Sequence, residues 1–207
     1  MATRDAPSTP TTVLVVDDEE GIRQALDRFL SRLGYRVLQA ASGAEALERQ
    51  QDGRPQAMLS DIRMPNMTGV ELVPKALALD SDIAIIMLTA IDEPRTAIEC
   101  MKLGAHDYLI KPVDLDELEL SLEAALRLRQ LEIDRRELEQ WLAHQVAERT
   151  RDLEERTSLA AEIALDAITA AGEGWAGREE AIQKLAKELR TAPQELIREI
   201  ETRRRVR

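Results

Sequence analysis

The feature of this sequence that most constrains its fold is a regular alternation of short apolar runs and amphipathic segments, which begins at Thr12. The apolar runs occupy residues 13–16, 36–39, 57–60, 83–88 and 105–110. Helical patterns lie between them, at 20–33, 43–51, 69–79 and 93–103. Continuous apolar strands separated by helices are typical of parallel strands that are buried on both faces. The alternation therefore predicts an α/β fold with a doubly wound, five-stranded parallel sheet.

Residues that favour helix ends lie where this alternation places them. Two pairs have the spacing of a capping box, in which a side chain accepts a hydrogen bond from the helix N-terminus: Ser42 with Glu45, and Asp114 with Glu117. Gly34 and Gly104 follow two of the helical patterns, where the left-handed conformation that ends many helices favours glycine. These signals support the same division into strands and helices.

A different pattern follows Pro112, because residues 114–170 contain neither Gly nor Pro and can form an unbroken helix. Apolar residues recur along it at spacings near three and four, with one skip: Leu128, Leu131, Leu138, Leu142, Val146 and Leu153. Arg135 and Arg149 interrupt this seam, so it resembles an imperfect coiled coil. A helix of about 50 residues would span about 75 Å, longer than a domain of this size. We therefore expect a homodimer through this helix, although an amphipathic helix lying on its own domain is the alternative.

The chain is expected to have four parts. Residues 1–11 are rich in Pro, Ser and Thr and predict a disordered arm. Residues 12–125 form the α/β domain and residues 126–170 the long helix. Residues 171–207 begin with Ala-Gly-Glu-Gly and predict a short helical tail, with helices near 177–190 and 193–204.

Composition excludes several classes of protein. The single cysteine, Cys100, cannot form an internal disulfide, which is typical of a reducing cytoplasm. The sequence has no apolar run long enough to span a membrane and no apolar core of a signal peptide near Met1. Residues 114–171 carry 15 acids and 7 bases, a net charge of −8, which argues against a nucleic-acid surface there. Residues 172–207, with 7 acids and 9 bases, leave DNA binding open.

Polar side chains at the ends of the predicted strands carry the chemistry. Ligands of an open parallel sheet bind outside the carboxyl ends of its strands, where the strand order reverses. Residues that would meet there are Asp17, Asp18 and Glu19 after the first strand, Asp61 after the third, Thr89 after the fourth and Lys111 after the fifth. Neighbouring carboxylates repel each other, and a Mg²⁺ ion would offset their charge. Each residue alone is a weak signal, but the ordered set is specific.

This part of the chain closely resembles the receiver domains of two-component response regulators, which have a flavodoxin-like fold. The resemblance covers residues 12–125 and rests on four segments: VLVVDDEE (13–20), LSDIRMPNMTGVEL (59–72), IIMLTA (85–90) and GAHDYLIKPVD (104–114). It implies that Asp61 accepts a phosphoryl group from a sensor histidine kinase, a transfer that is not classical enzyme catalysis, and later releases it by hydrolysis.

The resemblance also implies the roles of the surrounding residues. Mg²⁺ would be held by Asp17, Asp18 and Asp61 and by the backbone carbonyl of Arg63. Lys111, joined to Pro112 by a cis peptide bond, would bind the phosphoryl group. Thr89 and Tyr108 would form the switch that reports phosphorylation to the helical output.

Three outputs compete for the second half of the chain. The first, which we favour, is a dimerising helix whose tail docks a downstream protein. The second is DNA binding by a helix-turn-helix at 177–204, where Leu185, Ala186, Leu189 and Leu196 fall at core positions. Against it, Arg190 stands where the turn usually has Gly. The third, a cyclic-dinucleotide enzyme suggested by residues 135–156, is excluded for this chain because too few residues follow.

The two histidines are expected to have no chemical role. His106 precedes the last predicted strand, and His144 lies in the long helix beside Trp141. Both are interpreted as surface residues. Cys100 is interpreted as a packing residue rather than a redox sensor.

Overall fold

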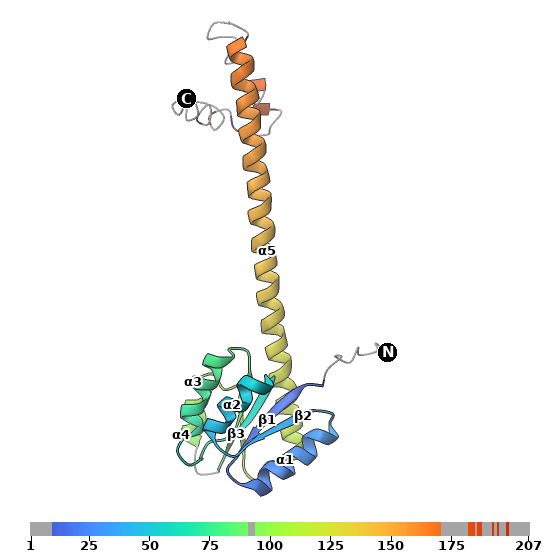
Figure 1. Ribbon diagram of the computed structural model, residues 1–207, viewed down its shortest axis with the longest axis vertical. Coiled ribbons are helices and arrows are strands. Elements are labelled where there is room, and N and C mark those ends of the chain that lie inside the picture. The colour runs from blue at the N-terminus through green and yellow to red at the C-terminus, as the bar shows by residue number, and fades with distance from the viewer. Residues whose placement is uncertain are drawn as a thin grey trace. The chain divides into compact units, whose positions relative to one another are not determined.

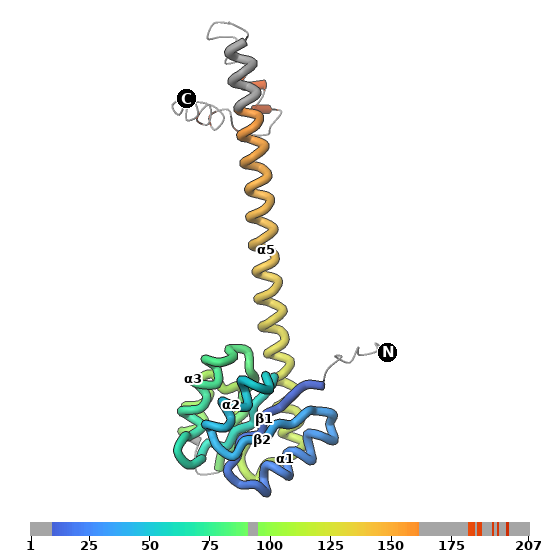
Figure 2. The backbone as a smooth tube through the Cα atoms, viewed as in Figure 1, coloured from blue at the N-terminus to red at the C-terminus, as the bar shows by residue number. Residues whose placement is uncertain are grey.

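The computed structural model describes residues 10–90 and 94–170 and a few tail positions, namely 182–184, 186, 187, 192, 194 and 198. Its strands are β1 (Thr12–Val16), β2 (Arg36–Ala40), β3 (Ala57–Asp61), β4 (Ala84–Thr89) and β5 (Asp107–Ile110). Its helices are α1 (Glu20–Arg32), α2 (Gly43–Gly53), α3 (Gly69–Leu79), α4 (Pro94–Lys102) and α5 (Leu115–Ala170). Strands and helices alternate along the backbone traced in Figure 2, as the sequence predicts.

The strands form one parallel sheet in the order β2-β1-β3-β4-β5, which confirms the doubly wound, five-stranded α/β fold. Figure 1 labels β1, β2 and β3 of this sheet. The strand order reverses between β1 and β3. A crevice is therefore expected outside the carboxyl ends of these two strands.

Helices cover both faces of the sheet. On one face, Val13 and Val15 pack with Leu30 of α1 and Leu118 of α5. On the other, Leu14 and Val16 pack with residues of α2, α3 and α4. Since successive side chains of a strand point to opposite faces, every residue of β1 is buried. Burial on both faces explains the continuous apolar runs of the sequence.

The predicted helix ends are confirmed. The Ser42 hydroxyl accepts a hydrogen bond from the Glu45 backbone N–H, and the Asp114 carboxylate accepts from the Asp116 and Glu117 N–H groups. Gly34 and Gly104 have left-handed φ angles of 90° and 109°. A complete capping box that the sequence interpretation missed, Thr68 with Glu71, begins α3 directly after the β3–α3 loop.

Helix α5 is a single helix of 56 residues, which confirms the long helix predicted from the absence of Gly and Pro. Its first turns belong to the α/β core, where Leu118 and Leu122 are fully buried and Ala125 is almost so. Every residue from Glu137 to His144 is exposed. The chain divides into two compact units, residues 1–136 and 137–207, and α5 contributes to both.

Some predictions fall on parts of the chain outside the described residues. These are nearly all of the arm at 1–11 and most of the helical tail at 171–207. In the described part of the chain, no helix combines the length and apolarity needed to cross a membrane.

One histidine differs from its interpretation. His106 is half-buried rather than on the surface, and its Nδ1 accepts a hydrogen bond of 3.2 Å from the Ile85 backbone N–H. Burial lowers its pKa. His144 is exposed, as expected, and Cys100 is fully buried with its pKa raised to about 11 by burial, as suits a packing residue.

The start of α3 leaves no space for a larger residue at Gly69. A Cβ atom there would overlap Met87 Cε, and it would lie 3.0 Å from Ile62 Cα and 3.1 Å from the Asp61 carbonyl oxygen. We expect Gly69→Ala to lower the free energy of unfolding by about 1–3 kcal/mol, the usual range for overpacking.

Gly21→Ala is the matched control for this prediction, since a Cβ atom at Gly21 in α1 meets nothing within 4 Å. It should leave stability unchanged or raise it by up to about 1 kcal/mol. Urea unfolding followed by circular dichroism measures both variants. Equal urea midpoints of unfolding for Gly69→Ala and Gly21→Ala would contradict the predicted crowding at Gly69.

Candidate functional site

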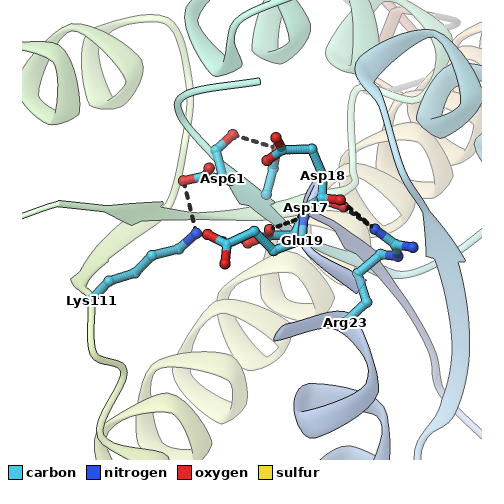
Figure 3. Close-up of polar contacts among 7 residues, drawn as sticks. Asp17, Asp18, Glu19, Arg23, Asp61 and Lys111 are labelled. Atoms are coloured by element: carbon cyan, nitrogen blue, oxygen red, sulfur yellow. Dashed lines mark hydrogen bonds and ion pairs between the residues drawn. The ribbon is translucent and has the colours of Figure 1, made fainter. Parts of the chain in front are cut away.

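Three carboxylates meet at the carboxyl ends of β1 and β3. Asp17 and Asp18 directly follow β1, and Asp61 is the last residue of β3. One carboxylate oxygen from each lies within 4.8 Å of those of the other two, and Figure 3 shows the side chains together. Asp17 is completely buried, Asp61 is 9% exposed and Asp18 is exposed, so the cluster has one side open to solvent.

Lys111 reaches this cluster from the end of β5 (Figure 3). Its Nζ lies 2.7 Å from Asp17 Oδ2 and 3.1 Å from Asp61 Oδ1. The peptide bond from Lys111 to Pro112 is cis, as the resemblance implied. One ammonium group therefore contacts two carboxylates from different strands.

Burial and charge act against each other on these groups. Burial raises the pKa of Asp61, and the Asp17 carboxylate adds to the effect, while the Lys111 ammonium group opposes it. Burial alone would lower the pKa of Lys111. Its hydrogen bond to Asp17 and the two neighbouring carboxylates outweigh that effect and raise the pKa of Lys111 above its ordinary value. The lysine is therefore fully charged at neutral pH.

The loop after β1 is held by a contact that the sequence interpretation did not identify. Arg23, in the first turns of α1, donates from Nη1 to the Asp17 carbonyl oxygen at 2.7 Å and the Asp18 carbonyl oxygen at 3.0 Å. The Glu19 backbone N–H donates to Asp17 Oδ1 at 2.9 Å. The position of Arg23 one turn after the acidic residues is the only sequence signal for this contact. These bonds anchor the backbone that carries Asp17 and Asp18.

The other predicted residues lie around this cluster. Thr89 ends β4, is 1% exposed, and donates from its hydroxyl to the Ala90 carbonyl oxygen at 3.2 Å. Tyr108, in β5, is 38% exposed. Arg63 lies in the β3–α3 loop, two residues after Asp61.

The donor set suits a hard divalent cation. Three carboxyl groups face a single ammonium group in a crevice that is partly shielded from water. Carboxylate oxygens with an open side fit Mg²⁺, which prefers oxygen ligands and usually retains several waters. The residues present therefore fit a magnesium site.

Comparison with known proteins agrees with this geometry. The sequence model of the protein family described as response regulator receiver domain matches residues 13–123, which is 111 of the 207 residues. The chain belongs to the response-regulator receiver family. It therefore carries the receiver domain of a two-component system.

Individual relatives match over the same region. The chain is 37% identical over 131 residues to the regulatory protein AtoC of Escherichia coli (strain K12), covering 63% of this chain and 28% of that protein. It is 40% identical over 122 residues to the response regulator MprA of Mycobacterium ulcerans (strain Agy99), covering 59% and 53%. The chain thus matches about half or less of the length of these curated relatives.

Solved structures resemble the receiver alone. Chemotaxis protein CheY4 of Vibrio cholerae aligns with a TM-score of 0.54 and 35% identity, covering 56% of this chain and 99% of that one. A receiver domain protein of Clostridium thermocellum aligns with a TM-score of 0.57 and 30% identity, covering 58% and 98%. Both alignments support the α/β fold described above.

The acidic cluster predicts saturable binding of Mg²⁺. Ligand that binds only the folded state stabilises it, so Mg²⁺ should raise the melting temperature of the protein. We expect Asp18→Ala to weaken the affinity at least about tenfold, a loss of about 1.4 kcal/mol in binding free energy. Calorimetric titration and thermal melting measure both effects.

Glu20→Ala is the control, because Glu20 is exposed in α1 and bonds Gln24 rather than the cluster. Its Mg²⁺ affinity should equal that of the natural protein. Equal affinities for all three proteins would place the cation elsewhere.

Proposed function

We propose that this protein is a two-component response regulator in which Asp61 accepts a phosphoryl group from a sensor histidine kinase in a Mg²⁺-dependent reaction. The observation that carries the proposal is the arrangement of three carboxylates within 4.8 Å of one another and the Lys111 ammonium group 3.1 Å from Asp61. Membership of the receiver family supports the same role.

The reaction transfers a phosphoryl group from a histidine nitrogen of the kinase to a carboxylate oxygen of Asp61. A carboxylate oxygen of Asp61 attacks the phosphorus of a phosphohistidine in line. A phosphorus–oxygen bond forms, the phosphorus–nitrogen bond breaks, and the imidazole leaves neutral when its second nitrogen carries a proton. Lys111 stabilises negative charge on the transferred group. Mg²⁺ bound by Asp17, Asp18, Asp61 and the Arg63 carbonyl would supply further neutralisation of that charge.

We propose Thr89 and Tyr108 as the switch. The Thr89 hydroxyl bonds only a neighbouring carbonyl oxygen among the contacts described, and Tyr108 is partly exposed on β5. Movement of Thr89 toward a phosphoryl oxygen would leave space for Tyr108 to turn inward. The signal is then a shift of population between two packings of the surface around α4, β5 and α5. Apart from transfer to Asp61 and hydrolysis there, we assign no enzyme activity.

The output is proposed to be a homodimer formed through α5. The seam residues predicted from the sequence are exposed by between 47% and 65%: Leu128, Leu131, Leu138, Leu142, Val146 and Leu153. Trp141 and Leu159 add further exposed apolar surface. Such a row on a long helix is typical of a surface that pairs with another helix.

DNA binding through residues 177–204 is the alternative output. Several relatives bear the names of transcriptional regulators, such as the transcriptional regulatory protein PrrA of Mycobacterium tuberculosis (strain ATCC 25618 / H37Rv). That match covers 60% of this chain and 54% of that protein, the length of a receiver. The names therefore do not bear on the tail, and its small excess of two positive charges favours docking of a protein.

Phosphorylation tests the receiver role. Incubated with Mg²⁺ and acetyl phosphate, the protein should gain one acid-stable, base-labile phosphoryl group, detected by mass spectrometry. Asp61→Asn should abolish it, because an amide is a poor nucleophile. Asp52→Asn, an equal change of charge on exposed α2, should label normally. Full labelling of Asp61→Asn would rule out this phosphoacceptor.

Light scattering tests the dimer. Leu142→Glu would place two carboxylates in the proposed apolar seam, so we expect the dissociation constant to rise at least about 100-fold. Gln140→Glu adds the same charge at an exposed position away from the seam and should dimerise normally. A natural protein that stays monomeric at tens of micromolar, phosphorylated or not, would contradict the dimer.

A further inference from the structure

One face of α5 changes from apolar to cationic within the receiver unit. Leu118, Leu122 and Ala125 of this face are buried in the core. Spacings of four and seven residues place Arg129 and Arg136 on the same face, farther along the helix. Arg129 is half-buried, and its Nε is buried with no hydrogen-bond partner among the described residues.

The cationic part of this face meets an acidic loop. The Arg136 guanidinium forms an ion pair and hydrogen bond with the Asp82 carboxylate, in the α3–β4 loop. Arg129 adds a second positive charge near Asp82, and Asp80 a second negative charge near Arg136. The Asp82 backbone N–H donates to Asp80 Oδ1 at 2.9 Å, which shapes the loop.

These contacts lower the pKa of Asp82. The largest cause is the hydrogen bond from Arg136, and the positive charges of Arg136 and Arg129 act in the same direction. Asp82 is therefore ionised at neutral pH, and the contact is a pair of full charges. The Arg136 side chain is 43% exposed and the Asp82 side chain 23% exposed, so water and salt weaken the attraction between the two charges. Such a contact can open without unfolding the core.

The α3–β4 loop lies at the amino ends of the strands, and the acidic cluster lies at their carboxyl ends. Asp82 precedes β4, and Thr89 ends it. Six residues of β-strand span about 20 Å, so one buried strand joins this contact to the proposed switch residue. After Arg136, the residues of α5 up to His144 are exposed.

We infer that Asp80 and Asp82 form an electrostatic clasp that holds the segment 129–136 of α5 on the receiver and determines where the output helix ceases to be part of it. The clasp and the apolar seam lie on different sides of the helix, because Leu138 is about 200° around it from Arg136. Both can therefore be occupied at once. The inference goes beyond the proposed function and does not depend on it.

Hydrogen exchange of the full-length protein tests the clasp. All variants carry Leu142→Glu, so that dimerisation cannot mask the result. We expect Asp82→Arg and Arg136→Asp each to lower the protection of backbone amides 129–136 about threefold to tenfold. The double variant, in which the two charges are exchanged, should restore most of that protection. Asp52→Asn, on α2, is the control and should leave it unchanged.

Two further readouts separate the clasp from a general loss of structure. Amides of β1, β3 and β4 should keep their protection in every variant, and Asp61 should still react with acetyl phosphate. Unchanged protection of 129–136 in both single variants would overturn the inference. So would a charge-exchanged variant no better protected than the single variants, since mutual attraction would then not hold the helix.

Discussion

The close approach of like charges at the carboxyl ends of β1 and β3 is the constraint on which the rest of the receiver depends. Moving carboxylates out of water is costly unless an opposite charge accompanies them. Lys111 supplies one, 2.7 Å from the fully buried Asp17 and 3.1 Å from Asp61. It can do so only if β5 delivers it to the same crevice, which requires β1, β3, β4 and β5 to pair in order. The site therefore depends on the fold.

Most of this arrangement could be predicted from the sequence for one physical reason. The central strands β1, β3 and β4 are buried on both faces and are mostly apolar, so the sequence shows where they stop. The first polar residue after each run lies at the carboxyl end of a parallel strand, and parallel strands bring those ends together. Asp17, Asp61, Thr89 and Lys111 were identified in this way. Their roles came from the family resemblance, because position alone does not distinguish a nucleophile from a ligand.

Contacts that depend on the shape of loops could not be predicted. The hydrogen bond from the Ile85 N–H to His106 Nδ1 joins residues 21 positions apart, and no sequence pattern around either residue predicts it. The ion pair of Asp82 with Arg136 joins residues 54 positions apart, on a loop and a helix whose charges look like ordinary solvated surface. Periodicity predicts which face of an element is buried. It does not predict which charged residue of another element lies opposite.

Helix α5 shows that two interpretations of one pattern need not exclude each other. The sequence left a choice between a helix lying on its own domain and a helix pairing with another copy. In the structure, the face of Leu118 and Leu122 is buried in the receiver, while Leu131 and Leu138 are exposed. A stripe repeating every three and four residues occupies only part of a helix circumference, so a second stripe fits beside it. Packing against the receiver therefore leaves the proposed dimer seam free. The sequence does not reveal how far the receiver-facing stripe extends, because its later positions, Arg129 and Arg136, are arginines. An arginine stabilises such a contact only where a carboxylate such as Asp82 lies opposite.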